Sequence, residues 1–326
     1  MIDSANAQRQ AAEYTTYDEA FRRVAALVDR TLTASPIVIR EYTSHLARSN
    51  GKYLRTASLL ACAMNEDDLV HCDAVLIATA IEIIHLATLV HDDIIDNADL
   101  RRGEPSLQKK FGKRTAVICG DYLLCAALRI ASGAEDRSSY VSRGIPDYMG
   151  KVCLGELNQH MHSGDNRLSV YRYLKIIAGK TAALFEAAFH GGALLAGDDD
   201  HAIKRYAKLG KYVGMIFQLT DDCMDYEATE ETAKKPVRSD YDQNVVTLPL
   251  IHAFRRVDGL REKSSAGPVT FEEIGEAVRA SGGLIYTRMV AKKYRDKALA
   301  ALDSLELTDA KRERLLAILD KAYRVF

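Results

Sequence analysis

The sequence predicts an all-α protein, and three observations support this prediction. Apolar residues recur with the spacing of one helix face along almost the whole chain, whereas the alternation of a half-buried strand is nearly absent. The chain is rich in Ala and Leu, contains no Trp and has only 6 Pro among 326 residues. No interdomain linker or fixed-period repeat is evident. We therefore expect one helical domain over residues 1–326, with residues 1–14 as a flexible N-terminal segment.

The individual helices follow from apolar periodicity and from local start signals. Ser35-Pro36 is expected to cap a helix with Pro36 at its first position, and Thr308-Asp309 to open the last helix. Several helices are long and apolar on more than one face, as is typical of the central helices of a large bundle. Two polar loops, 132–145 and 227–243, separate them. The predicted helices cover residues 16–32, 36–49, 53–64, 73–97, 113–131, 146–162, 169–195, 199–225, 244–256, 270–281, 284–303 and 308–324.

Charge and cysteine usage argue against several classes of protein. Lys plus Arg total 44 against 45 for Asp plus Glu, so no basic surplus points to nucleic acid. The polar N-terminus lacks the apolar core of a signal peptide. The longest apolar run, 74–90, contains Glu82 and His85, which argues against a membrane span. The 6 cysteines show no Cys-x-x-Cys pairing and are expected to be reduced, buried thiols of a cytoplasmic protein.

Two aspartate boxes of the form Asp-Asp-x-x-Asp, at residues 92–96 and 221–225, are the most informative feature. The first and last aspartates of each box are four residues apart, so they share one face of a helix. Carboxylates crowded on an apolar helix repel each other and resist burial. A shared hard cation relieves both problems, and oxygen ligands of this kind suit Mg²⁺. Two such boxes facing each other across a cavity would hold a cation cluster suited to a diphosphate.

A single box of this form is more often a solvated helix end than a metal site. Here both copies interrupt strongly apolar segments, residues 81–90 before the first and residues 213–219 before the second. Solvated acidic faces rarely have such approaches, so the pair favours metal binding.

A bound diphosphate also needs fixed cationic donors, with Arg giving forked contacts and Lys a point charge. A lysine inside an apolar helix, such as Lys180, needs an anion or a route to water. The charged loop 227–243 is either a segment that closes over a bound anion or a plain surface linker. The candidate donors are Lys52 and Arg55, Arg101 and Arg102, Lys180, and Lys235.

Longer stretches around these residues resemble the trans-polyprenyl diphosphate synthase family. Residues 84–103 resemble the family's first aspartate-rich motif, and residues 217–226 resemble its second. The match extends in order from about Gly51 to Leu250, and two boxes with Arg-Arg-Gly in register make it specific. Shorter matching segments are residues 120–124, 180–185, 235–237 and 247–250.

The resemblance implies a bundle of mostly antiparallel helices around a deep central cavity, usually assembled as a homodimer. It implies head-to-tail condensation of an allylic diphosphate, such as farnesyl or geranylgeranyl diphosphate, with isopentenyl diphosphate. It assigns three Mg²⁺ ions to Asp92, Asp96 and Asp221, with Asp93, Asp222 and Asp225 in support. It assigns the allylic diphosphate to Arg101, Lys180 and Lys235, isopentenyl diphosphate to Lys52, Arg55, His85 and Arg102, and the carbocation to Thr181 and Gln218.

These implied roles agree with the chemistry of the reaction. Metal ions and cationic side chains neutralise a leaving diphosphate, and an apolar, water-poor cavity protects an allylic cation. The departing diphosphate is the expected acceptor of the last proton, since no separate base is evident. Without the resemblance, a lone histidine on an apolar helix, such as His85, is more often a core residue than a ligand. Glu82 and His85 also match the Glu-x-x-His motif of di-iron bundles, but the sequence contains no second copy of this motif.

Product length is expected to depend on the helix that precedes the first box. The growing tail should run past Ala87 and Thr88, one turn before Asp92, and then past Ile84 and Ile83. None of these residues is aromatic, whereas short-chain proteins resembling this family tend to place an aromatic floor there. We therefore expect a medium or long product of roughly six to ten isoprene units, with a quinone side chain as the expected destination.

Two departures from the family pattern leave alternatives open. Tyr53 replaces a basic residue of the usual Gly-Gly-Lys-Arg-x-Arg-Pro run, and Val245 replaces a common Lys. The Val245 variant resembles some medium- and long-chain synthases, including catalytic subunits of two-component enzymes, so a heteromeric small subunit stays open. A terpene cyclase or a non-catalytic subunit is disfavoured by the intact second box and by the second group of basic residues.

Overall fold

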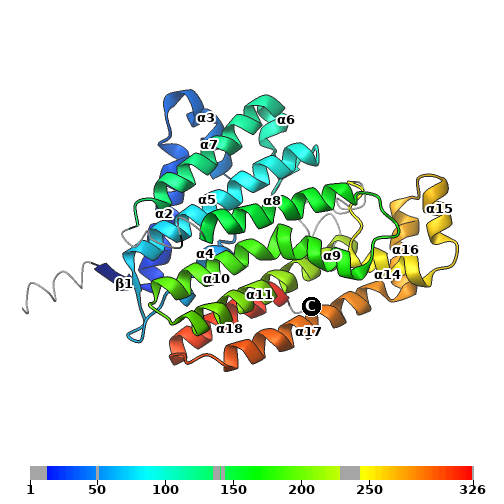
Figure 1. The fold of residues 1–326 in the computed structure, drawn as a ribbon. Helices are drawn as coiled ribbons and strands as arrows, with labels where there is room; N and C mark the ends of the chain where they lie inside the picture. Colours follow the sequence, from blue (N-terminus) through cyan, green and yellow to red (C-terminus); the bar gives the residue numbers. More distant parts are fainter. Residues whose placement is uncertain (1–12, 49–50, 135–139, 141–143, 228–242, 325–326) are drawn as a thin grey trace, which may run out of the picture. The chain divides into compact units, whose positions relative to one another are not determined.

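The computed structural model describes residues 13–48, 51–134, 140, 144–227 and 243–324, and its elements are almost entirely helical (Figure 1). The predicted all-α class is confirmed. The chain divides into two compact units. The first comprises Met1–Asp147, Glu186–Gly210 and Ser304–Ile318, and the second comprises Tyr148–Phe185, Lys211–Asp303 and Leu319–Phe326. That the whole chain forms one domain stays a prediction, and residues 1–12 of the expected N-terminal segment lie outside the described residues.

The first unit is built around one long apolar helix, α5 (Cys72–Ile95). Its neighbours are α2 (Tyr17–Thr33), α4 (Leu54–Cys62) and α7 (Lys113–Ala131). By length and composition alone α5 could cross a membrane, but 67% of its most apolar window is buried inside the protein. It is thus the core helix of this unit. The unit also contains α3 (Ile37–Ala47), α6 (Leu107–Phe111), most of α10 (Ala183–Leu195), and the first turns of α11 (Asp200–Glu227) and α18 (Asp309–Tyr323).

Four short strands, which the sequence did not predict, join parts of the first unit. Strand β1 (Tyr14–Thr16) pairs antiparallel with β2 (Leu69–His71). Strands β3 (Leu100–Arg101) and β4 (Glu104–Pro105) form a hairpin directly after the first aspartate box. Its two turn residues, Arg102 and Gly103, have φ of 54° and 84°, as a type I′ turn requires. Such short segments carry too few residues for an alternating pattern to emerge.

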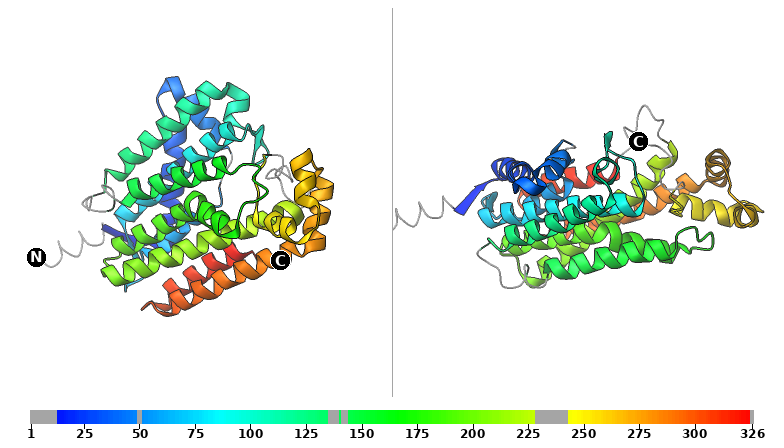
Figure 2. Two further views of the ribbon diagram at one scale, coloured as in Figure 1. Left: turned by 45° about the vertical axis from the view of Figure 1, so that its right-hand side comes forward. Right: turned by 90° about the horizontal axis from the view of Figure 1, so that it is seen from above.

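The second unit has its own apolar core, formed by α9 (Val170–Ile177), α11 and the later helices. Helices α14 (Leu248–Arg256), α15 (Leu260–Ala266) and α16 (Phe271–Ser281) lie together, from yellow to orange, in both views of Figure 2. Helix α17 (Gly283–Asp303) packs against α14 and α16. Between α9 and α10 the chain forms a π-helical turn, η2 (Ala178–Ala182). Helix α8 (Ile145–Met161) lies mostly in this unit.

The predicted helices are confirmed, with local corrections. Helices α6 and α15 were not predicted, because each is short. Pro36 is the N-cap of α3, with ψ of 145°, and not its first helical residue, so that part of the prediction was wrong. Thr308 caps α18 as predicted, its hydroxyl accepting from the Lys311 amide at 3.2 Å.

All 6 cysteines lie in the described residues, and each is a thiol outside any disulfide. Cys62, Cys119 and Cys223 are buried, but Cys125 and Cys153 are exposed, which corrects the expectation of uniformly buried thiols.

Candidate functional site

The first aspartate box closes helix α5. Asp92 and Asp96 are partly exposed, and the Asp96 amide donates to the Asp92 carbonyl at 2.8 Å, so the two keep the predicted i, i+4 relation. Asp93 is only 4% exposed. The box therefore presents its outer carboxylates and buries its middle one.

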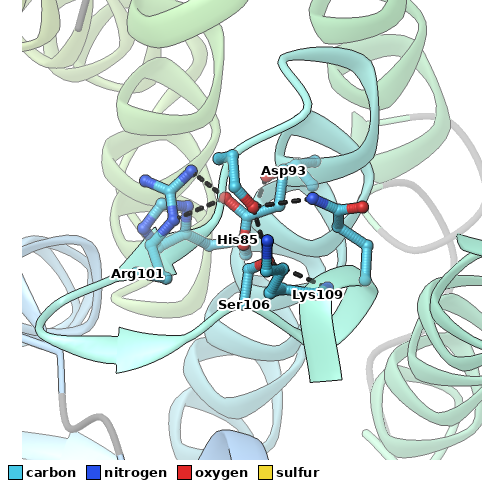
Figure 3. A network of polar contacts seen from close by, with 8 residues as sticks. His85, Asp93, Arg101, Ser106 and Lys109 are labelled. Atoms are coloured by element: carbon cyan, nitrogen blue, oxygen red, sulfur yellow. Dashed lines mark hydrogen bonds and ion pairs between the residues drawn. The ribbon is translucent and has the colours of Figure 1, made fainter. Parts of the chain in front are cut away.

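Asp93 is held by the arginine of the hairpin. Arg101 donates to one carboxylate oxygen of Asp93 through Nε at 2.8 Å and also through Nη2 (Figure 3). Burial raises the pKa of Asp93, while the bond and charge of Arg101 act in the opposite direction. The segment after the box is fixed as well, since the Ser106 hydroxyl and Gln108 Nε2 both donate to the Ala98 carbonyl, at 2.6 and 2.7 Å. Lys109 and Asp99 form an exposed ion pair beside it, at 2.9 Å. The hairpin thus orients the Arg101 side chain toward the first aspartate box.

A second cationic group surrounds Glu82 in the first unit. Glu82 is 4% exposed and accepts from the Thr56 hydroxyl at 3.0 Å. Burial raises its pKa, whereas the nearby charges of Arg55 and Arg102 lower it. A Cβ on Gly51 would lie 3.2 Å from Arg102 Nη1 and 3.4 Å from Glu82 Oε1, so the glycine backbone packs directly against this pair.

His85 belongs to the same neighbourhood as these arginines. Its pKa lies well below the usual value, because burial disfavours the charged ring and Arg55, Arg102 and Arg101 add positive charge around it. His85 is thus a neutral imidazole among cations, an environment that favours an anion.

Lys52 is exposed and precedes helix α4, which begins at Leu54. Lys52 therefore does not share a helix face with Arg55, which lies in α4. The cause is Tyr53, the N-cap of α4, whose φ of 49° is the left-handed conformation. Its ring packs edge-on against Phe21, with centroids 6.0 Å apart.

The second aspartate box lies in the last turns of α11 and repeats the arrangement of the first. Asp221 and Asp225 are partly exposed, whereas Asp222 is 1% exposed. Asp222 accepts from the Tyr173 hydroxyl and from Gln218 Nε2, the latter at 2.8 Å. Burial raises the pKa of Asp222 to about 7 against the effect of these two bonds, and Asp221 and Asp225 raise it further.

Lys180 and Thr181 stand in the π-helical turn η2, where such turns often mark functional positions. Lys180 Nζ pairs with Glu156 of α8 at 2.8 Å, and both side chains are largely buried. The Thr181 hydroxyl donates to Gln218 Oε1 at 2.6 Å. This turn and the second box are therefore joined by direct hydrogen bonds.

The chain's last described residue also reaches the second box. Arg324 Nη1 donates to Asp221 Oδ1 at 2.5 Å and contacts Met224 Sδ at 2.9 Å. Its guanidinium lies over the Phe217 ring, 4.8 Å from the centroid. Arg324 and Arg288 both line a small cavity beside α11.

The residues proposed to set chain length lie on α5 as predicted. Thr88 is partly exposed, while Ala87, Ile84 and Ile83 are at most 2% exposed. Lys235 lies outside the described residues.

The structure groups the predicted residues within each unit. Arg55, His85, Asp93, Arg101 and Arg102 gather in the first, and Thr181, Gln218 and the second box gather in the second. Among the residues that the structure describes, no three His, Cys, Asp or Glu side chains are grouped so as to hold a metal ion by themselves.

Four residues that hold the predicted ones were not identified as their partners from the sequence. Glu82 pairs with the arginines, Glu156 with Lys180, Tyr173 with Asp222, and Arg324 with Asp221. A buried acid inside an otherwise apolar helix, as at Glu82 in α5, is the signal that could have marked one of them.

The fold and the site together define a class: an all-α protein with two aspartate boxes, each accompanied by cationic side chains. Residues 36–273 match the family model described as polyprenyl synthetase. The chain therefore belongs to the polyprenyl synthetase family.

Individual relatives agree with that assignment. The chain is 34% identical over 306 residues to heptaprenyl diphosphate synthase component 2 of Geobacillus stearothermophilus, covering 92% of this chain and 94% of the relative. It is 33% identical over 293 residues to octaprenyl diphosphate synthase of Escherichia coli (strain K12), covering 86% and 88%. A solved polyprenyl synthase from Caulobacter crescentus CB15, complexed with calcium and isoprenyl diphosphate, superposes with a TM-score of 0.85 at 32% identity over 94% of each chain.

Proposed function

We propose that this chain is a Mg²⁺-dependent prenyltransferase that elongates an allylic diphosphate with isopentenyl diphosphate, head to tail. One observation carries the proposal: both boxes present their outer carboxylates on one helix face and bury the middle one against protein donors. The two boxes lie on helices that are far apart in the sequence, yet both have this arrangement. An acidic helix end that is exposed to solvent has no reason to bury its middle carboxylate.

The donor set fits magnesium. Mg²⁺ is usually held by one or two protein carboxylates together with water and substrate phosphate oxygens. Asp92 and Asp96 would supply such a pair in the first box, and Asp221 and Asp225 in the second. Three ions are expected once a diphosphate is bound. When bound, they neutralise the charge that develops on the leaving diphosphate.

The cationic side chains would hold the allylic diphosphate. Arg101 and Lys180 are each anchored by a carboxylate, Asp93 and Glu156, so both are oriented before substrate arrives. Such preorganisation removes part of the cost of ordering long side chains on binding. Lys235 is proposed to bind the same diphosphate, on the basis of the family motif alone.

Isopentenyl diphosphate would bind where Arg55, Arg102 and the neutral ring of His85 gather. Lys52 is proposed to join them. Glu82 would keep the two guanidiniums together in the substrate-free protein, since like charges otherwise repel. In the second unit, Thr181 and Gln218 would face the allylic cation with their oxygens.

A product of roughly six to ten isoprene units is proposed, because no aromatic side chain replaces Thr88 one turn before the first box. The heptaprenyl and octaprenyl names of the relatives support this range. A cytoplasmic location and a quinone pathway are proposed with it.

Homodimer assembly is proposed as well. Large apolar side chains are exposed on two helices, at Val117, Ile118 and Leu128 of α7 and at Leu154, Leu157 and Met161 of α8. Such exposure is typical of interaction surfaces. The relative named component 2 favours one alternative, a catalytic subunit that needs a second, different chain.

Incubation of the purified protein with Mg²⁺, farnesyl diphosphate and labelled isopentenyl diphosphate tests the proposal. Extractable label that disappears with excess EDTA is expected, and chromatography of the product gives its length. Hydrocarbon formed from the allylic substrate alone would instead indicate a cyclase. Turnover that survives full chelation would contradict the magnesium assignment, and turnover only with an added partner would favour the two-component alternative.

A matched pair of variants tests the site itself. Asp92→Asn removes a proposed ligand and should lower the rate by about 10²-fold or more. Asp99→Asn removes an exposed carboxylate just beyond the box, which pairs with Lys109, and should change the rate little. Equal effects of the two substitutions would refute the assignment.

A further inference from the structure

A continuous chain of hydrogen bonds links three elements of the second unit. The Tyr173 hydroxyl of α9 donates to Asp222 Oδ2, and Gln218 Nε2 donates to Asp222 Oδ1 at 2.8 Å. Gln218 Oε1 accepts from the Thr181 hydroxyl at 2.6 Å. Tyr173, Asp222 and Thr181 are 3%, 1% and 8% exposed, so water competes little for these bonds.

Asp222 determines which group donates and which accepts in each of these hydrogen bonds. Both of its carboxylate oxygens accept, so both neighbours must donate. Gln218 therefore turns its amide nitrogen to Asp222 and its oxygen to Thr181. Thr181 must then donate its only hydroxyl hydrogen to Gln218, and its oxygen can offer only lone pairs to any further group.

A hydroxyl fixed in this way suits a cationic partner. Lone pairs stabilise positive charge, whereas a freely rotating hydroxyl presents its hydrogen part of the time and loses that benefit. Reorientation during the reaction would also cost free energy, which a preset dipole avoids.

We propose that Tyr173 is a positioning residue of this enzyme: through Asp222 and Gln218, it locks the Thr181 hydroxyl with its lone pairs available to the allylic cation. The proposal rests on the proposed prenyl-transfer function. In this role Tyr173 is not a catalytic residue, because it acts through the bond that it donates to Asp222. Asp222 thus serves as an anchor for Gln218.

The first test is Tyr173→Phe, with Tyr206→Phe as its matched control. Both tyrosines are buried, but the Tyr206 hydroxyl has no hydrogen-bond partner. Tyr173→Phe should lower kcat about tenfold or more, with KM for isopentenyl diphosphate changed less than about twofold, because ground-state binding of that substrate is untouched. Tyr206→Phe should leave both parameters near wild type. A rise in KM with kcat unchanged would overturn the proposal.

A double-mutant cycle separates positioning from general stability. In a Thr181→Val background the hydroxyl that the chain orients is gone, so adding Tyr173→Phe should lower kcat no further. If Tyr173 only supports the fold, it should lower kcat by the same factor in both backgrounds. That second result would refute the proposal.

A readout that needs no turnover completes the test. With ¹⁵N-glutamine labelling, the side-chain amide of Gln218 should show slowed hydrogen exchange in the substrate-free protein, and Tyr173→Phe should abolish this protection while Tyr206→Phe keeps it. Unchanged protection in Tyr173→Phe would overturn the positioning role. A wild-type protein that does not elongate would overturn the proposed function, and the exchange measurement would still decide whether the chain of bonds exists.

Discussion

Gly155 of α8 offers a sharp test of how the site is held, because it packs against the backbone of the π-helical turn. A Cβ at Gly155 would lie 2.1 Å from the Lys180 amide nitrogen and 2.5 Å from the Gly179 carbonyl carbon. Ordinary contacts at a Cβ are 3.4–4 Å, so Gly155→Ala forces the two backbones apart by more than about 1 Å. No flexible side chain is present to move instead.

Gly150 of the same helix supplies the control, because a Cβ there meets nothing within 4 Å. Both substitutions gain about 1 kcal/mol of helix propensity, and this gain cancels in the comparison. What remains is the overpacking at Gly155, about 1–3 kcal/mol. At about 2 °C per kcal/mol for a chain of this size, Gly155→Ala should melt about 2–6 °C below Gly150→Ala.

Activity should respond more strongly than stability. A shift of about 1 Å in Lys180 and Thr181 is expected to cost about 10²-fold in kcat/KM, whereas Gly150→Ala should retain wild-type activity. Gly179→Ala should be intermediate, since its Cβ would come only within 2.9 Å of Gly155 Cα. Thermal unfolding and steady-state kinetics on the three variants decide the matter. Equal melting temperatures and rates for Gly155→Ala and Gly150→Ala would refute the close-packing account.

Three further predictions concern individual side chains. Arg324→Ala removes a mostly buried ion pair with Asp221 worth about 1 kcal/mol, so the Mg²⁺ concentration for half-maximal rate should fall about fivefold. An unchanged Mg²⁺ titration would show that the arginine does not compete with the ion. Glu156→Gln keeps the size of the side chain but removes the negative charge that faces Lys180, and should raise KM for the allylic diphosphate about tenfold. An unchanged KM would contradict this prediction. Thr88→Phe should shorten the product, as read by chromatography, because Thr88 is partly exposed, whereas Ala87→Phe at a fully buried position should mainly lower the melting temperature.

Most of the fold was predictable because helices are encoded locally. Apolar periodicity and caps such as Thr308 depend on residues within one or two turns, so the long helices were found. The β3–β4 hairpin was missed, because two-residue strands have no period. The π-helical turn at Ala178–Ala182 was missed as well, since one extra residue per turn leaves no compositional trace.

The candidate site was predictable only in part. The boxes and basic residues were identified from spacing and from the family motifs. Their partners were not, because they come from distant positions: Glu156 lies 24 residues before Lys180, and Tyr173 lies 49 residues before Asp222. The left-handed backbone at Tyr53, which separates Lys52 from the helix that carries Arg55, was not predicted either.

The two boxes also show why a motif cannot assign its own ligands. In the sequence alone, nothing distinguishes the three aspartates of each box from one another. In the structure the middle one is buried and receives hydrogen bonds from outside the box, from Arg101 at Asp93 and from Tyr173 and Gln218 at Asp222. The outer two are partly exposed, although Asp221 also accepts from Arg324. A buried carboxylate whose oxygens are committed to protein donors is a poor candidate for direct metal binding, because a cation would have to displace those donors. Since Mg²⁺ needs only one or two protein carboxylates beside phosphate oxygens, the two outer aspartates of each box would suffice for the proposed magnesium ions. The middle aspartate would then anchor the side chains that are proposed to contact the substrate.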